Sequence, residues 1–178
     1  MKMKRALSAI CCLALCGLPA LAKTHSSAKD SAATAMTDQK FVDFAAQTDM
    51  LEAHLGQMAA DQASSQGVKD YAQMLVADHT SDYQQLTGIA AKANLSIPKG
   101  LDAEHDKMIA PFEKLKGAAF DTRYVHEMVA GHTHAIEVFT KESTSAQNAD
   151  LKAYASAALP TLQKHLDGAK DLEKKPAK

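Results

Sequence analysis

Apolar residues recur at intervals of three and four from Thr37 to Leu172, with almost no alternation of β-branched and polar residues. This spacing places the apolar side chains on one face of an α-helix, whereas a half-buried strand would alternate with a period of two. Long amphipathic helices must bury their apolar faces against one another. The sequence therefore predicts an all-α fold made of packed helices.

The pattern divides into four long helices. We expect the first over residues 38–63, a second that Ser64 or Ser65 caps and that ends near Ala93, a third over 118–143, and a fourth that Asn148 or Asp150 caps and that ends at Leu172. A short extra helix is predicted over 102–116, interrupted near Pro111.

The connections between these helices differ in length. Short loops join the first helix to the second and the third to the fourth, but about two dozen residues separate the second and third. A connection of that length can cross the bundle, so that the second and third helices run parallel. This is the one-crossover arrangement of ferritin-like four-helix bundles.

The first 22 residues have the three parts of an export signal. Basic residues precede an apolar stretch over 6–21, which closes with Ala20-Leu21-Ala22. The stretch is too short and wrongly flanked for a membrane span and is typical of a cleaved signal peptide. A lipoprotein signal at Cys16 competes, but Leu15 stands where a small residue is needed. We predict cleavage after Ala22 and a periplasmic location.

The remaining chain divides into a tether, a domain and a tail. Residues 23–36 lack apolar periodicity and predict a disordered tether, 37–172 predict the four-helix domain, and 173–178 predict a disordered basic tail.

The three cysteines all lie in the predicted signal peptide, so the mature chain can hold no disulfide and no thiolate-bound metal. With a net charge of −1, the sequence predicts no nucleic-acid partner. It also predicts no transmembrane segment in the mature protein.

Four polar or ionisable residues stand on otherwise apolar helix faces: Glu52, His79, His132 and His165. Each lies about fourteen residues into its own helix, so a rise of about 1.5 Å per residue puts all four at a similar depth. One such side chain per helix at one depth is how metal sites are built in bundle cores. Three imidazoles and a carboxylate suit one divalent transition-metal ion. Asp82 and Tyr83, one turn from His79, are candidates to orient that ring.

A structural interpretation of the same residues competes with the metal site. A histidine on an apolar face is commonly hydrogen-bonded to a core neighbour, and its pairing with Glu52 would set the helix register. His54, His126 and His134 lie near the edges of their faces and are expected to be less buried. The sequence contains no nucleophile elbow, phosphate-binding glycine loop or HExxH motif, so no catalytic residue is predicted.

Four segments together resemble the exported bacterial domain-of-unknown-function 4142 family: 44–60 with Glu52, 74–79 ending at His79, 120–125 followed by His132, and 159–166 with His165. The resemblance covers residues 41–172 and implies a ferritin-like helical domain without an assigned activity. Di-iron proteins of the ferritin-like fold use Glu-x-x-His on two helices. Val76 and Leu162 replace that glutamate here, which leaves too few carboxylates to bridge two irons.

Two functions fit these observations. One is a non-enzymatic, stress-related module of the cell envelope, whose partners would be another protein or a second copy of the chain. The other is a mononuclear metal-binding protein that uses the three histidines and Glu52. Convergence of the four side chains favours the second function, and an amphipathic surface that the core does not use favours the first.

Overall fold

The computed structural model describes residues 36–175. The predicted signal peptide, the tether up to residue 35 and tail residues 176–178 lie outside the described residues. Within them the chain forms helices and no strand, which confirms the all-α prediction. The helices are α1 (Asp38–Gln62), α2 (Gln66–Lys92), α3 (Ala103–Ile109), α4 (Ala118–Ser145) and α5 (Ala149–Glu173).

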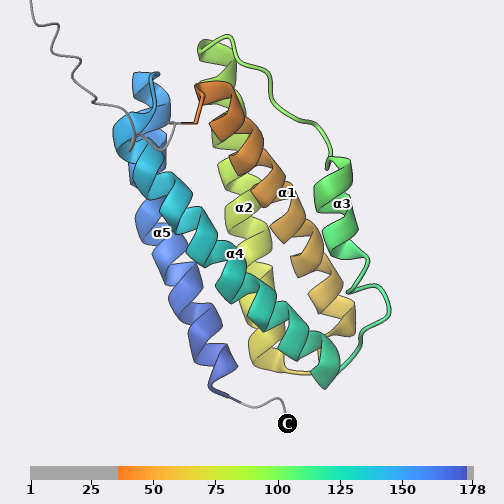
Figure 1. Ribbon diagram of the computed structural model, residues 1–178. Helices are drawn as coiled ribbons and strands as arrows, with labels where there is room; N and C mark the ends of the chain where they lie inside the picture. The colour runs from red at the N-terminus through yellow and green to blue at the C-terminus, as the bar shows by residue number, and fades with distance from the viewer. Residues whose placement is uncertain (1–35, 176–178) are drawn as a thin grey trace, which may run out of the picture. The chain divides into compact units, whose positions relative to one another are not determined.

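The four long helices pack as two antiparallel hairpins, α1 with α2 and α4 with α5 (Figure 1). The backbone N–H of Gly117, just before α4, donates to the carbonyl of Gln62 at the end of α1, 2.7 Å away. At the other end, Asp38 of α1 accepts from the N–H groups of Gln147 and Asn148, each at 2.8 Å. Helices α1 and α4 are therefore antiparallel, so α2 and α4 run in the same direction. The predicted crossover is confirmed.

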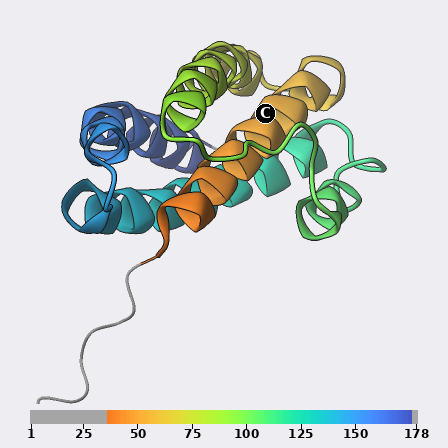
Figure 2. The same cartoon turned by 90° about the horizontal axis from the view of Figure 1, so that it is seen from above.

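The crossover connection carries α3, which packs against α1 outside the four long helices (Figure 2). Helix α3 ends at Ile109, whereas the sequence predicted a helix that continued to residue 116. Pro111 has no N–H with which to continue the helical bonding. The chain instead makes turns in which Phe112 donates to the carbonyl of Ile109, at 2.8 Å, and the Phe112 side chain is fully buried.

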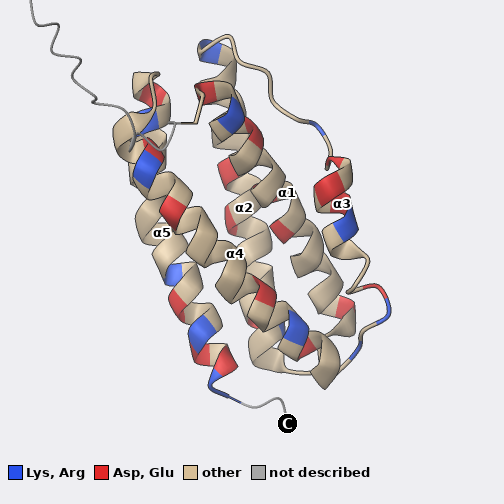
Figure 3. Ribbon diagram, viewed as in Figure 1, with Lys and Arg blue, Asp and Glu red and all other residues tan. Residues whose placement is uncertain are grey.

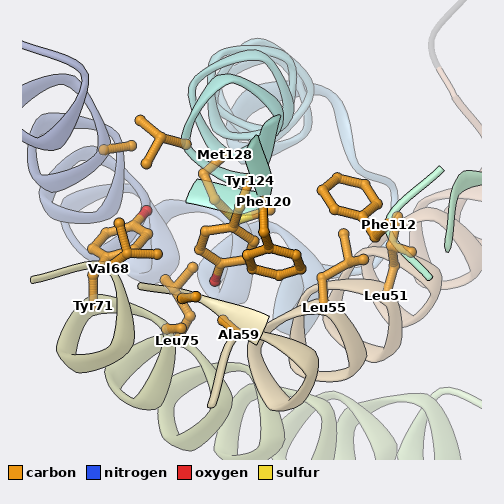
Figure 4. Packing of buried hydrophobic residues seen from close by; sticks show 14 of the residues in the cluster. Leu51, Leu55, Ala59, Val68, Tyr71, Leu75, Phe112, Phe120, Tyr124 and Met128 are labelled. Carbon is orange, nitrogen blue, oxygen red and sulfur yellow. The ribbon is translucent and has the colours of Figure 1, made fainter. Parts of the chain in front are cut away.

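Buried apolar side chains of the described residues form two clusters. We call the first the Phe120 cluster; it joins α1, α2 and α4 near the α1–α2 loop and includes Leu55, Leu75, Phe112, Phe120 and Tyr124 (Figure 4). The second, the Phe41 cluster, lies toward the α4–α5 loop and includes Phe41, Leu86, Phe139, Leu151 and Tyr154. Along α2, α4 and α5 the histidine predicted at mid-helix falls between these clusters, and on α1 Glu52 directly follows Leu51, the first α1 residue of the Phe120 cluster. The core is therefore two apolar halves with a polar layer between them.

Charged residues of both signs are interspersed along the helices (Figure 3). Among residues 36–175, no helix combines the length and the hydropathy needed to cross a membrane. At the ends of the domain, Met36 packs against the Phe41 cluster, and Glu173, which the sequence had assigned to the tail, is the last residue of α5.

Candidate metal centre

The layer between the two apolar clusters consists of five buried polar side chains, which we call the histidine layer: Asp49, Glu52, His79, His132 and His165. Each is at most 4% exposed. Burial of an ionisable group is costly unless the group is paired, hydrogen-bonded or bound to a metal. The contacts within the layer therefore decide what it does.

The three histidines come from three helices and face one point. One ring nitrogen from each of His79 on α2, His132 on α4 and His165 on α5 lies within 4.8 Å of the other two. The ring centroids are 5.2–5.8 Å apart, and His132 Nε2 lies 3.2 Å from His165 Nδ1. Three of the four residues predicted at one depth are thus brought together as a candidate set of metal ligands.

The fourth predicted residue, Glu52 of α1, approaches two of these rings. Its Oε2 atom is 3.0 Å from Nε2 of His79 and 3.3 Å from Nε2 of His132. The contact with His79 is close but does not have the geometry of a hydrogen bond, and neither Glu52 Oε2 nor His79 Nε2 has another hydrogen-bond partner. Three helices therefore direct one histidine nitrogen each into the same small volume, and Glu52 of the fourth contacts two of those nitrogens.

The ring nitrogens that point away from this volume are all held by acceptors. His79 Nδ1 is 2.8 Å from Asp49 Oδ1, His132 Nδ1 is 2.9 Å from the Met128 carbonyl, and His165 Nε2 is 2.9 Å from Asp78 Oδ2. A carbonyl or a carboxylate accepts, so each outward nitrogen carries the proton. Each inward nitrogen of a neutral ring then presents its lone pair. This is the arrangement that fixes and orients metal-bound histidines.

Charges within the layer determine which rings are protonated. Burial works to lower the pKa of His79, but the carboxylates of Glu52 and Asp49 beside it raise that pKa well above its ordinary value. For His165 burial prevails and lowers the pKa to about 4. Burial would raise the pKa of Glu52, yet the neighbouring histidine charges hold it below its ordinary value. The centre of the layer is therefore an anionic point that attracts a cation, whether a proton on His79 or a metal ion.

A family profile described as "Domain of unknown function (DUF4142)" matches residues 23–172. The chain belongs to the DUF4142 family. This agrees with the resemblance found in the four sequence segments around the histidine layer. Among curated proteins, no match to the chain was found.

Solved structures of CopM share the fold of this DUF4142 domain. The Cu(II)-bound form is 13% identical, with a TM-score of 0.62 over 79% of this chain and 98% of that chain. The Ag-bound form obtained by soaking is 14% identical, with a TM-score of 0.64 over 79% and 97%. The Cu(I)-bound form is 13% identical, with a TM-score of 0.63 over 78% and 96%. At these identities the likeness establishes the helical fold.

The residues expected to orient His79 in this DUF4142 domain are not the ones that do so. Asp82 accepts from the Tyr154 hydroxyl at 2.5 Å, and the Tyr83 hydroxyl donates to the carbonyl of Pro98. Residues one turn apart on a helix share a face, but the Asp82 side chain points toward α5 and the Tyr83 side chain toward the crossover connection, not toward the His79 ring. Asp49 takes the role instead. Its signal in the sequence was its position three residues before Glu52, on the same face of α1.

The remaining histidines of the long helices lie where the sequence placed them. His54, His126 and His134 are exposed. Asp78 could not be singled out from the sequence, because adjacent helical residues point about 100° apart and its contact with His165 depends on how α2 packs on α5.

Proposed function

We propose that this chain is a mononuclear metal-binding protein, in which His79, His132, His165 and Glu52 bind one divalent transition-metal ion in the bundle core. The observation that carries the proposal is the inward convergence of three histidine nitrogens from three helices, with each ring held at its opposite nitrogen and Glu52 of the fourth helix contacting two of them. The metal-bound forms of CopM, which have the same fold, support it.

The poorly aligned contact between Glu52 and His79 favours a metal ion over a purely structural polar contact. A layer that only fixed helix register would align donors with acceptors, yet Glu52 Oε2 and His79 Nε2, 3.0 Å apart, form an ion pair without hydrogen-bond geometry. A metal ion between the two atoms would be bound by both. Nitrogen donors with one carboxylate suit Cu(II) and Zn(II), and Cu(II) heads the affinity order of first-row divalent ions.

Titration of the chelator-treated protein tests the proposal. Zinc, copper, manganese and ferrous salts would each be added while stoichiometry and thermal unfolding are followed. We expect one equivalent of Cu(II) or Zn(II) to bind and to stabilise the fold by about 2.7 kcal/mol at a free metal concentration of 100 times Kd. If no ion binds stoichiometrically to the folded chain, the histidine layer serves helix register and the function lies on the surface.

We further propose that the chain is exported and acts as a non-enzymatic, stress-related metal-binding module of the bacterial cell envelope. The basic and apolar leader before Ala22 supports export. We expect Edman sequencing of the protein from the producing cells to begin at Lys23, and a Cys16→Ala variant to be processed in the same way. A lipid-modified Cys16 as the first residue would contradict this cleavage site.

Asp49→Asn is expected to weaken metal binding 10–100-fold, the usual effect of removing a partner that orients a metal-bound histidine. The amide preserves the shape but removes the carboxylate, whose pKa burial raises to about 7 and which accepts from His79 Nδ1. Competition against a chromophoric chelator measures the change. Asp61→Asn, an exposed position on the same helix, is the matched control and should bind as the wild type does. Equal affinities for the two variants would show that Asp49 has no role at the site.

Metal binding is expected to release about one proton at pH 7 and to strengthen about tenfold per pH unit while His79 is protonated. The neighbouring carboxylates raise the pKa of His79, so the metal must displace a proton from that ring. His165 contributes no proton at pH 7, because burial lowers its pKa to about 4. Calorimetry in two buffers of different ionisation enthalpy measures the release, and identical heats in both would contradict it.

A further inference from the structure

A cleft between α2 and α5 reaches the histidine layer from the surface. It has a volume of about 230 Å³. Its α2 wall includes Asp78, His79 and Asp82, and its α5 wall includes Tyr154, Thr161 and His165. Two of the three clustered histidines therefore line the inner end of a cavity that opens to solvent.

Polar side chains line this cleft from mouth to floor, beside the apolar Ala157, Ala158 and Leu162. The Asp78 side chain is 39% exposed, yet its Oδ2 atom contacts Nε2 of His165, whose side chain is 1% exposed. One turn further along α2, Asp82 faces the same cleft and accepts from Tyr154. At the floor, the buried Nε2 of His79 has no hydrogen-bond partner. A cation moving inward thus meets carboxylate oxygens before it meets imidazole nitrogens.

A second cleft, of about 220 Å³, approaches the layer from the opposite side, where Glu52 lines it. Its exposed lining is largely apolar, with Phe44, Leu55 and Met108, although His105, Glu127 and His134 also line it. Apolar stretches offer a hydrated cation nothing in exchange for the water it must shed, which makes passage costly. The polar cleft between α2 and α5 is therefore the easier path for an ion.

We infer that the cleft between α2 and α5 is the route by which the metal ion enters and leaves the histidine layer. This inference rests on the proposed function and adds to it the path that the ion takes. The partly exposed carboxylates of Asp78 and Asp82 attract the cation and replace its water stepwise, and His165 and His79 receive it at the floor.

Blocking the cleft gives a test that separates a route from a ligand. Thr161 is exposed and lines the cleft one turn before His165, so Thr161→Trp places a bulky ring in the passage without altering a donor atom. A route is shared by binding and release, so a block slows both rates by the same factor and leaves Kd unchanged. We expect uptake of Cu(II), followed by its visible absorption in a stopped-flow instrument, and release to excess chelator to slow at least about tenfold each.

Two variants complete the test. Ala153→Trp, at an exposed position of α5 outside the cleft, should load at the wild-type rate. Met108→Trp blocks the opposite cleft and should also load at the wild-type rate. Equal loading by Thr161→Trp and Ala153→Trp, or slow loading by Met108→Trp alone, would overturn the route while leaving the metal site intact. A wild-type protein that takes up no Cu(II) at equilibrium would instead overturn the proposed function, and the route with it.

Discussion

His132→Ala is expected to abolish stoichiometric metal binding, with a loss of affinity greater than the roughly 100-fold upper range for an orienting partner. Its Nε2 atom lies 3.2 Å from His165 Nδ1 and 3.3 Å from Glu52 Oε2, so this ring joins two other donors. Its removal leaves α4 without a ligand and exposes the remaining donors to a cavity. Calorimetric titration with Cu(II) and Zn(II), on protein treated with chelator, measures the loss.

The His132 side chain is fully buried, so the alanine variant also tests stability. We expect the fold to lose about 2–4 kcal/mol, mainly from the cavity that the missing ring leaves. His132→Gln, which fills more of the space, separates the two effects, because it should recover stability without recovering full affinity. His134→Ala, two residues away on the exposed side of α4, is the matched control. Full binding by His132→Ala would show that the histidine layer is not the metal site.

The arrangement of the helices was predictable because each one carries its own apolar period. Helix α1 begins at Asp38, as predicted, and ends at Gln62, one residue before the predicted Ala63. The long connection between α2 and α4 also indicated their parallel direction, since a link of that length has room to cross the bundle. The spacing of apolar residues and the lengths of the connections therefore predict most of the architecture.

Features that depend on contacts between distant residues were not predictable. The sequence placed the cap of α2 at Ser64 or Ser65, and Ser65 is the N-cap residue, but its side chain makes no capping bond. Asp121 of α4 accepts from the N–H groups of Ser64 and Ser65 instead, at 3.1 and 2.9 Å. No local pattern indicates that an acid 56 or 57 residues away takes this role. The end of α3 at Ile109 has a local signal in Pro111, but the burial of Phe112 beyond it depends on tertiary packing.

The candidate site shows the same division. Glu52 and the three histidines could be found, because a polar residue that interrupts an apolar face is visible in one helix at a time. Asp49 and Asp78 could not be assigned, because their partners His79 and His165 lie on other helices. The side chains that point inward are encoded locally, and those that hold them depend on tertiary packing.

Gly56→Ala is expected to destabilise the fold by about 1–3 kcal/mol, the usual effect of overpacking, although alanine is the better helix former. A Cβ at Gly56 of α1 would lie 2.7 Å from Val76 Cγ2 and 3.0 Å from the Ala72 carbonyl oxygen on α2. The first contact is with a stiff β-branched side chain and the second with backbone, so the two helices must move apart. Glu52 and His79 lie one turn along from this contact, so their separation should grow and metal affinity should fall as well.

Gly88→Ala on α2 is the matched control, because its Cβ would meet nothing within 4 Å. There the change should stabilise the fold by about 0.5–1 kcal/mol, through helix propensity alone. Urea unfolding of both variants, without and with metal, measures the change in the free energy of unfolding that each substitution causes. Val76→Ala in the Gly56→Ala background removes the closest contact, and it should restore part of the metal affinity if the spacing of α1 and α2 positions Glu52 against His79. Stabilisation of the fold by Gly56→Ala would show that α1 and α2 are not held at this close approach.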